Sequence, residues 1–405
     1  MKLFLPFLLY MVLFGPNFIF IDLFAIFNIL MATLYIGYVL IRGQIEKPIL
    51  FAIVFTAIAL LFYIPTMIVY NFSEYDLAVE YLKLIVYIIS SFFVVKLYSR
   101  YYKEKFYLKL LLHIYYSVLI VSFTVILFFV FPELRNFVYP LLASKMSSMW
   151  EVIRGIRYID ISVGAGTTLS LVFFVGFVLN VFLLREKILQ NYIFTIMPLV
   201  FLVSAFLTAR SGMFLIIGYT LLVLLSSFTI KLSRLSAFTY VNIFIVIGLF
   251  FYLFQSNNST FASVIPWAFE IFINLIESGT FSTASTNNLF NDHYFFEFNY
   301  LELIFGKNYF NAPTDVGYLK ILYANGIFGL FVFIIFYLYM FGTVLKNKNF
   351  ELKHLKIMML IFLSTILLIN IKELIFTNSR GLFLMVLIIY FSIMEYSEVK
   401  KGKEI

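Results

Sequence analysis

The feature that most constrains this chain is a series of apolar segments that each have the length of a membrane crossing. The hydrocarbon core of a bilayer is about 30 Å thick, so a helix needs about 20 predominantly apolar residues to cross it. Such segments recur over all 405 residues, 63% of which are hydrophobic and only 12% charged. A soluble domain with that balance would have to cover its surface with apolar side chains. The sequence therefore predicts an all-α integral membrane protein.

The length criterion predicts about twelve membrane-spanning helices. Their expected ranges are 3–20, 23–41, 49–70, 82–98, 110–131, 162–184, 192–208, the segment between the turns at 208–212 and 231–234, then 237–254, 317–343, 357–375 and 381–394. Gly15 and Pro16 are expected to kink the first span, which turns into the second near Asp22. We expect one polytopic membrane domain covering 1–405.

The loops between the spans predict how the chain is oriented. Residues 255–316, between the ninth and tenth spans, form the largest loop, and residues 132–161 form the second. Cytoplasmic loops of membrane proteins carry an excess of Lys and Arg. The most basic short loops fall on the opposite side from these two large loops, so both termini are expected in the cytoplasm and the large loops outside. This asymmetry explains the net charge of +8 without a nucleic-acid partner.

Several kinds of chemistry are disfavoured by the residues present. The chain has no cysteine, and none of its three histidines is paired at metal-ligand spacing, so we expect neither thiol chemistry nor a metal site. No Asp or Glu lies in the middle of a predicted span, which argues against an ion-coupled transporter. The charges that stand out lie at the outer ends of spans, so the functional site is expected to face outward.

Two outer turns each place an arginine before an apolar helix. They are TARSG at 208–212, with Arg210, and TNSRG at 377–381, with Arg380. The start of a helix favours an anion, and the arginine fork matches phosphate oxygens. The predicted span after Arg380 is shorter than the hydrocarbon core, which puts this arginine at or slightly below the lipid boundary. The alternative is that both side chains extend to lipid headgroups and only fix the helix ends.

A second basic feature lies in the loop 132–161. Arg154 and Arg157 are spaced at i and i+3, so on a helix they share one face. They precede the stretch IDISVGAGTT, whose glycines allow a backbone or a ligand to approach closely. The pattern favours a substrate contact and an amphipathic helix at the membrane interface equally.

The largest loop ends in charged residues at the mouth of the tenth span. Asp315 is expected either to cap that helix or to accept a proton from a sugar hydroxyl. Lys320 either pairs with Asp315 or holds a phosphate, and His293 is either solvated or a substrate contact. Residues 269–278 have an amphipathic helical pattern. The aromatic and Asn residues of the loop suit a carbohydrate, although a membrane interface has the same composition.

The order of these features resembles the O-antigen and capsular polysaccharide polymerases of the Wzy type, which are related to the O-antigen ligases. The likeness rests on the many spans, the large loop late in the chain and the arginine turn at 208–212. A polar residue, Asp315, also precedes a helix with Gly326 and Gly329 in a Gly-x-x-Gly. In the ligases that position is commonly a histidine, so Asp315 favours a polymerase. Arg157 resembles a further family arginine, although the Pro-Asn pair often found after it is missing.

The resemblance implies a metal-independent, inverting glycosyltransferase at the external face of the bacterial plasma membrane, with no cofactor. Its donor and acceptor are oligosaccharides on undecaprenyl diphosphate, and a chain-length regulator is a further candidate partner. Asp315 is then the catalytic base. The diphosphate is assigned to Arg210, Arg157, Arg380 and Lys320, and further substrate contacts to His293 and Arg154. The alternatives are a lipid-linked oligosaccharide flippase or another transporter, an O-antigen ligase, and a structural membrane protein.

Overall fold

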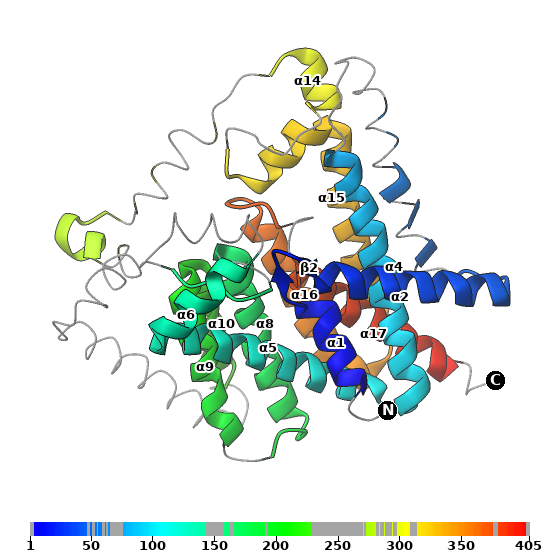
Figure 1. Cartoon of the computed structure of the whole chain (residues 1–405), viewed down its shortest axis with the longest axis horizontal. Coiled ribbons are helices and arrows are strands. Elements are labelled where there is room, and N and C mark those ends of the chain that lie inside the picture. Colours follow the sequence, from blue (N-terminus) through cyan, green and yellow to red (C-terminus); the bar gives the residue numbers. More distant parts are fainter. Residues whose placement is uncertain are drawn as a thin grey trace. The chain divides into compact units, whose positions relative to one another are not determined.

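The computed structural model is almost entirely helical (Figure 1). It describes residues 4–46, 49–50, 53–54, 56–58, 61, 64, 76–142, 157–162, 166–190, 193–227, 270, 273–280, 283, 287, 294, 298–307, 314–375 and 380–401. Within these ranges the strands are the two-residue β1 (Asn17–Phe18) and β2 (Ile21–Asp22), which pair antiparallel. The predicted all-α architecture is therefore confirmed.

Of the helices in the described ranges, 6 are long and apolar enough to cross a membrane. They are α2 (Leu23–Arg42), α4 (Asp76–Tyr102), α5 (Phe106–Val130), α8 (Gly166–Arg185), α15 (Gly317–Lys346) and α17 (Leu382–Lys401). Each overlaps a span predicted from the sequence, as an all-α membrane protein requires. The predicted span at 49–70 lies largely outside the described residues, and the one at 237–254 lies wholly outside them.

Within the described ranges the other helices are shorter. They are α1 (Phe4–Phe14), α6 (Pro132–Val138), η1 (Tyr139–Leu141), α9 (Ile193–Thr208), α10 (Arg210–Ser227), α14 (Tyr300–Phe305), η3 (Phe350–Leu352) and α16 (Lys353–Ile369). Of these, α9, α10 and α16 begin close to where the seventh, eighth and eleventh spans were predicted.

The first predicted span, 3–20, is wrong. The helix α1 ends at Phe14, and the chain then turns through β1 and β2 instead of continuing as a kinked helix. At Gly15 the backbone passes so close to Phe24 that a Cβ would lie 2.5 Å from the Phe24 nitrogen. The next residue, Pro16, has no N–H with which to extend the helix. The Gly-Pro pair therefore ends the helix.

The last predicted span, 381–394, is too short. The helix α17 continues to Lys401, through the polar tail. The tail is hydrogen-bonded to the loop after α15: Asn347 Nδ2 donates to Ser397 Oγ at 2.7 Å. The helix is long enough to cross a membrane, so its length does not place Arg380 at or below the lipid boundary.

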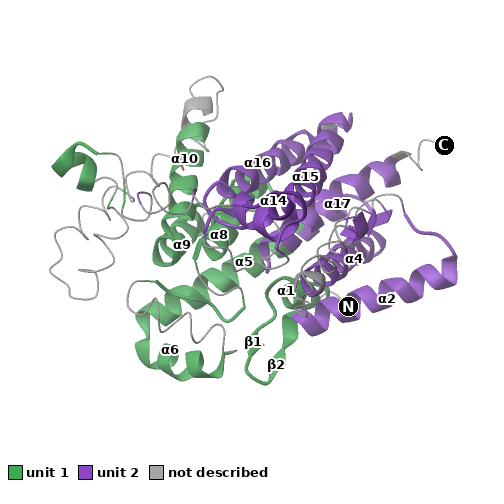
Figure 2. Cartoon of the chain, turned by 90° about the horizontal axis from the view of Figure 1, so that it is seen from above, with its two compact units in different colours: residues 1–24, 111–283 green, residues 25–110, 284–405 purple. Residues whose placement is uncertain are grey.

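The chain divides into two compact units (Figure 2). Unit 1 comprises residues 1–24 and 111–283, and unit 2 comprises residues 25–110 and 284–405. Each unit combines helices from distant parts of the sequence, so neither corresponds to one continuous stretch of chain. The single membrane domain expected from the sequence stays a prediction.

Unit 1 is built around α8, almost all of whose side chains are buried. Gly176 in the middle of α8 allows its neighbours to approach closely, because a Cβ there would lie 2.6 Å from Val118 of α5 and 2.7 Å from Phe201 of α9. One turn further on, Asn180 Nδ2 donates to the buried Tyr115 hydroxyl of α5 at 2.9 Å. Close packing and a buried hydrogen bond thus fix three helices of unit 1 together.

Unit 2 is held by polar contacts between its long helices. Ser90 of α4 donates to Asn28 Oδ1 of α2 at 2.6 Å, with both side chains buried. The Tyr81 hydroxyl of α4 donates a hydrogen bond to Asn325 Oδ1 of α15, and this bond is also buried. Such bonds satisfy polar groups that have no water to bond with in an apolar environment.

At one end of unit 2, a network of ion pairs connects α4, α17 and the segment that follows α2. Lys96 Nζ of α4 lies 2.6 Å from Glu46 Oε2, which follows α2, and 2.5 Å from Glu395 Oε2 of α17. Ser99 Oγ also donates to Glu395 at 3.1 Å. The segments that meet here are ones predicted to lie on the same, cytoplasmic, membrane face. Their contact is consistent with that shared face, and the identity of the face stays a prediction.

The helix α15 is broken at Gly326, whose φ of 65° and ψ of −173° are not helical. The short helix α14 lies beside the broken end (Figure 1). A Cβ on Gly326 would lie 2.1 Å from the carbonyl oxygen of Ile304 in α14. Reciprocally, a Cβ on Gly306, where φ is 81°, would lie 2.4 Å from the carbonyl oxygen of Ala324. Both glycines are required because the two backbones touch.

A hydrogen bond joins the loop after α14 to α15 just before the break. The backbone N–H of Lys307 donates to the carbonyl oxygen of Tyr323 at 2.6 Å. The Lys307 ammonium also lies 5.1 Å from the centre of the Tyr323 ring and 3.1 Å from Glu302 Oε1. The end of the largest predicted loop is therefore bonded to the broken helix.

Gly326→Ala is expected to destabilise the protein by about 1–3 kcal/mol from backbone strain, with a further cost from the contact with Ile304. Gly342→Ala in the same helix is the matched control, because a Cβ there meets nothing within 4 Å. The control should be neutral or slightly stabilising. Thermal unfolding of the purified proteins in detergent, followed by circular dichroism, measures both. Equal melting temperatures for the two variants would contradict the steric argument.

Lys96→Met is expected to destabilise the protein by about 3–5 kcal/mol, because it leaves the buried Glu395 carboxylate without its counter-ion. The double variant Lys96→Met, Glu395→Gln should recover most of the loss. Lys83→Met is the control, since Lys83 pairs with Glu80 on the surface of the same helix, where a pair contributes at most about 1 kcal/mol. The same unfolding measurement applies, and failure of the double variant to recover would argue against a charge effect.

Candidate functional site

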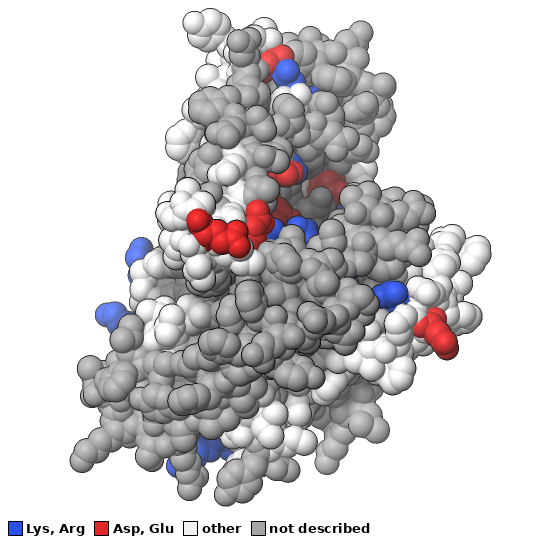
Figure 3. All heavy atoms as spheres, turned by 90° about the vertical axis from the view of Figure 1, so that its left-hand side faces the viewer, with Lys and Arg blue, Asp and Glu red and all other residues white. Residues whose placement is uncertain are grey.

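Only 12% of the residues are charged, so groups of charged side chains are the first candidates for a functional site. On the face shown in Figure 3 the described Lys, Arg, Asp and Glu residues form a few separate groups. The predicted site residues fall into both units: Arg157 and Arg210 in unit 1, and Asp315, Lys320 and Arg380 in unit 2. The remaining two, Arg154 and His293, lie outside the described residues. One site that combines all of them stays a prediction.

In unit 1 the N-terminal ends of α8 and α10 lie side by side. Ser170 Oγ of α8 is 3.3 Å from Ser211 Oγ of α10, and the backbone N–H of Gly212 donates to Ser170 Oγ at 3.2 Å. Further along both helices, Tyr219 of α10 packs edge-on against Phe177 of α8. The two helices are therefore parallel, and their positive dipole ends lie together.

A glycine allows this close approach. A Cβ on Gly212 would lie only 2.3 Å from the carbonyl oxygen of Ser170. The sequence turn 208–212 therefore does two things at once. It provides the small residue that brings two helix starts together, and it places Arg210 as the first residue of α10. Together these features create a region that favours an anion.

The segment 157–162 is bonded to the same end of unit 1. The backbone N–H of Tyr158 donates to the carbonyl oxygen of Leu207 at 2.9 Å, just before the turn that carries Arg210. The Tyr139 hydroxyl donates to the carbonyl oxygen of Ile159 at 3.0 Å and holds the segment from its other side. The chain beside Arg157 is thus attached to the chain beside Arg210.

Arg210 is engaged by a carboxylate that the sequence analysis did not single out. Arg210 Nη1 lies 2.7 Å from Glu270 Oε2, and the two side chains are 12% and 24% exposed. Glu270 belongs to the largest predicted loop and lies within the stretch 269–278 that was given an amphipathic pattern. Residues 273–278 are indeed helical. The only sequence signal for Glu270 was its acidic character in an otherwise apolar stretch.

A buried acid and a further arginine were also missed. Asp160 is fully buried and accepts a hydrogen bond from Ser162 Oγ at 2.5 Å. Arg135 lies over the Tyr158 ring at 5.6 Å and donates to its hydroxyl at 3.5 Å. Burial raises the pKa of the Tyr158 hydroxyl, and the nearby Arg135 offsets part of that rise, so the hydroxyl remains protonated at neutral pH. A lone acid directly before an apolar span was the available sign of Asp160.

In unit 2, Asp315 is an exposed carboxylate and not a helix cap. Val316 is the N-cap of α15 and receives no side-chain cap, so the expectation that Asp315 caps this helix is wrong. The side-chain oxygen of Thr314 instead accepts from the Val316 N–H at 3.1 Å. Asp315 is 68% exposed and lies 3.5 Å from Lys320 Nζ, so the predicted pairing of these two residues is present but loose.

The start of α15 packs against the turn after α16. A Cβ on Gly317 would lie 2.6 Å from Asn370 Oδ1, and the backbone N–H of Tyr318 donates to the Asn370 carbonyl at 3.1 Å. Tyr294, from the largest predicted loop, donates its hydroxyl to the carbonyl oxygen of Ile371 at 2.7 Å. These contacts fix the segment that carries Asp315.

Arg380 lies at the beginning of α17, as the TNSRG turn predicted. The carbonyl oxygen of Arg380 accepts from Leu382 N at 2.8 Å, and that of Gly381 accepts from Met385 N at 2.8 Å. Arg380 therefore precedes the first turn of the helix. The residues that separate it from the turn after α16 lie outside the described ranges.

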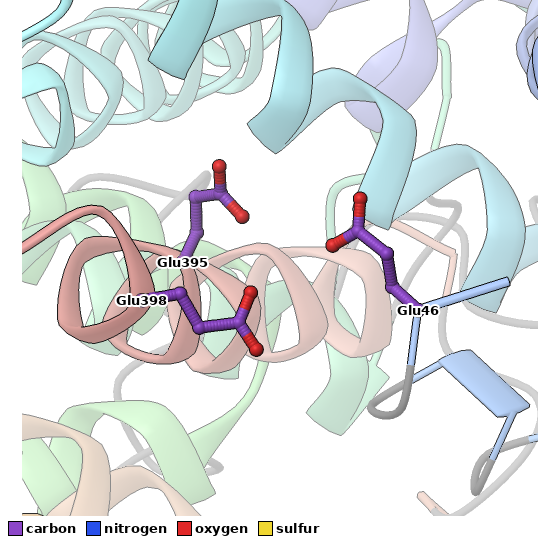
Figure 4. A group of neighbouring side chains, drawn as sticks. All are labelled: Glu46, Glu395 and Glu398. Atoms are coloured by element: carbon purple, nitrogen blue, oxygen red, sulfur yellow. The ribbon is translucent and has the colours of Figure 1, made fainter. Parts of the chain in front are cut away.

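Three acids at the other end of unit 2 are the candidate metal ligands among the described residues. Glu46, Glu395 and Glu398 have carboxylate oxygens within 4.8 Å of one another (Figure 4). However, the Lys96 ammonium already contacts two of them at 2.5–2.6 Å. That ammonium supplies the positive charge that a metal ion would otherwise bring, so the group is explained as an ion network.

Comparisons with protein-family models, with curated proteins and with solved structures find no match to this chain.

Asp315→Asn is expected to change the free energy of unfolding by less than about 1 kcal/mol, because an exposed and loosely paired carboxylate contributes little. Asp160→Asn is the contrasting variant. Asp160 is fully buried and hydrogen-bonded, so replacing it should cost more, about 1–3 kcal/mol. Thermal unfolding in detergent compares the two. A large loss of stability in Asp315→Asn would mean that this residue has a structural role.

Proposed function

We propose that this protein is a polysaccharide polymerase that joins undecaprenyl-diphosphate-linked repeat units at the external face of the bacterial plasma membrane. In this proposal the chain crosses the membrane with about twelve helices, keeps both termini in the cytoplasm and exposes its largest loop outside. The observation that carries the proposal is the anion-favouring end of unit 1. There, two parallel helix starts meet and Arg210 already binds an anionic group.

The reaction needs a place for the negative charge that develops on the leaving group. An acceptor hydroxyl oxygen attacks the anomeric carbon of the donor sugar, and the bond from that carbon to the diphosphate oxygen breaks. The leaving undecaprenyl diphosphate gains negative charge as this happens. Arg210, Arg157 and the helix N–H groups are suited to stabilising that charge through charge-assisted hydrogen bonds.

The acceptor hydroxyl must also lose its proton. In the proposal Asp315 takes it, because this carboxylate is exposed and an acceptor hydroxyl can reach it. Arg380, at the start of α17, and Lys320 provide further positive charge for a diphosphate. Attack from the face opposite to the leaving group inverts the anomeric centre.

The test uses purified full-length protein in detergent with EDTA and a repeat unit on undecaprenyl diphosphate, with products separated by size. The wild type should make a ladder of lengthening glycans. Arg210→Ala should reduce its rate by about 100-fold or more, because it removes a cation that stabilises the transition state. Asp315→Asn should also suppress it while leaving the protein folded.

Glu277→Gln is the matched control, since Glu277 is an exposed acid of the same loop. It should leave the ladder unchanged. A lipid-linked unit that crosses the bilayer of proteoliposomes without forming a ladder would overturn the polymerase and favour the flippase. A ladder that persists in Arg210→Ala would remove unit 1 from the reaction.

A further inference from the structure

Arg210 and Glu270 form a contact between the start of a helix and a distant loop. The guanidinium belongs to the first residue of α10, and the carboxylate belongs to the largest predicted loop. Their closest atoms are 2.7 Å apart, and both side chains keep some exposure to solvent. The Glu270 carboxylate therefore contacts Arg210 in the region where the N-terminal ends of α8 and α10 favour an anion.

The two side chains are only 12% and 24% exposed, so water and salt screen their attraction little, and separating the pair costs free energy. A carboxylate brings a single negative charge to Arg210. A diphosphate brings more charge and offers pairs of oxygens that match the arginine fork. A diphosphate can therefore compensate for the loss of the carboxylate, whereas a singly charged anion gains little by displacing it.

We propose that Glu270 is a specificity-determining counter-ion: it occupies Arg210 until an anion of higher charge, such as a diphosphate, displaces it. This inference rests on the proposed function, because it assigns Arg210 to the diphosphate of the donor. Glu270 selects against weaker anions by competing with them. It takes no part in bond making or breaking.

A purely structural role for the pair makes a different prediction. If Glu270 only fastens the loop, removing its charge lowers the stability of the protein and does not change which anion is preferred. If Glu270 competes with the ligand, removing its charge raises the affinity for weakly charged anions the most. The preference between two anions thus separates the two roles.

The experiment measures the binding of pyrophosphate and of inorganic phosphate to the purified full-length protein in detergent, by isothermal titration calorimetry. Glu270→Gln should bind inorganic phosphate about fivefold more tightly than the wild type, and the ratio of the pyrophosphate to the phosphate affinity should fall. Glu270→Asp should restore much of that ratio. Arg210→Ala should lose the binding of both anions.

Glu277→Gln controls for the general loss of a negative charge from the loop and should bind both anions as the wild type does. An unchanged affinity ratio in Glu270→Gln would overturn the inference, and so would the loss of all binding in this variant. The ladder assay separates this result from the proposed function. If the wild type makes a ladder but Glu270→Gln leaves the affinity ratio unchanged, only the counter-ion role of Glu270 is overturned. If the ratio changes but the wild type makes no ladder, only the polymerase function is overturned.

Discussion

Inside a bilayer a polar group has no water to bond with, so this chain must satisfy its buried polar groups by itself. In each unit, helices contact one another at positions where buried polar side chains form hydrogen bonds. Asn180 bonds Tyr115 in unit 1, and Asn325 accepts from Tyr81 in unit 2. Apolar packing alone cannot specify which helices meet, because lipid tails are as apolar as leucine. A few buried amides and hydroxyls therefore select the neighbours, and glycines such as Gly176 and Gly212 let them approach.

Charged side chains at the helix ends are also paired with partners from other segments of the chain. Lys96 contacts two glutamates at one end of unit 2, and one of them, Glu395, is buried. Arg210 is 12% exposed and pairs with Glu270, which is 24% exposed. An ammonium held by two carboxylates is costly to separate from them, whereas the Arg210 pair lies beside two helix starts that also favour an incoming anion. The first therefore suits a fixed structural role, and the second suits a place where a ligand arrives.

The sequence predicted the regular parts of this protein well. Apolar runs of about 20 residues located the long helices, because the requirement of the bilayer is local and can be read from composition. The ends were less predictable. The early stop at Gly15 depends on a close approach to Phe24, and the extension of α17 depends on Asn347, so both are set by tertiary contacts. For the candidate site, the turn with Arg210 was visible, but its partner Glu270 was not. No local pattern links residues that lie so far apart in the chain.

The break in α15 divides this helix into two parts, one of which has the length of a membrane crossing. An unbroken helix of 30 residues would measure about 45 Å, well beyond the hydrocarbon core. The part that follows Gly326 has about 20 residues and measures about 30 Å, which matches the core. The break therefore removes the hydrophobic mismatch that a continuous helix would have to relieve by tilting. Asp315 precedes α15 and Lys320 lies before the break, so a crossing made by the later part alone would leave both charges outside the hydrocarbon.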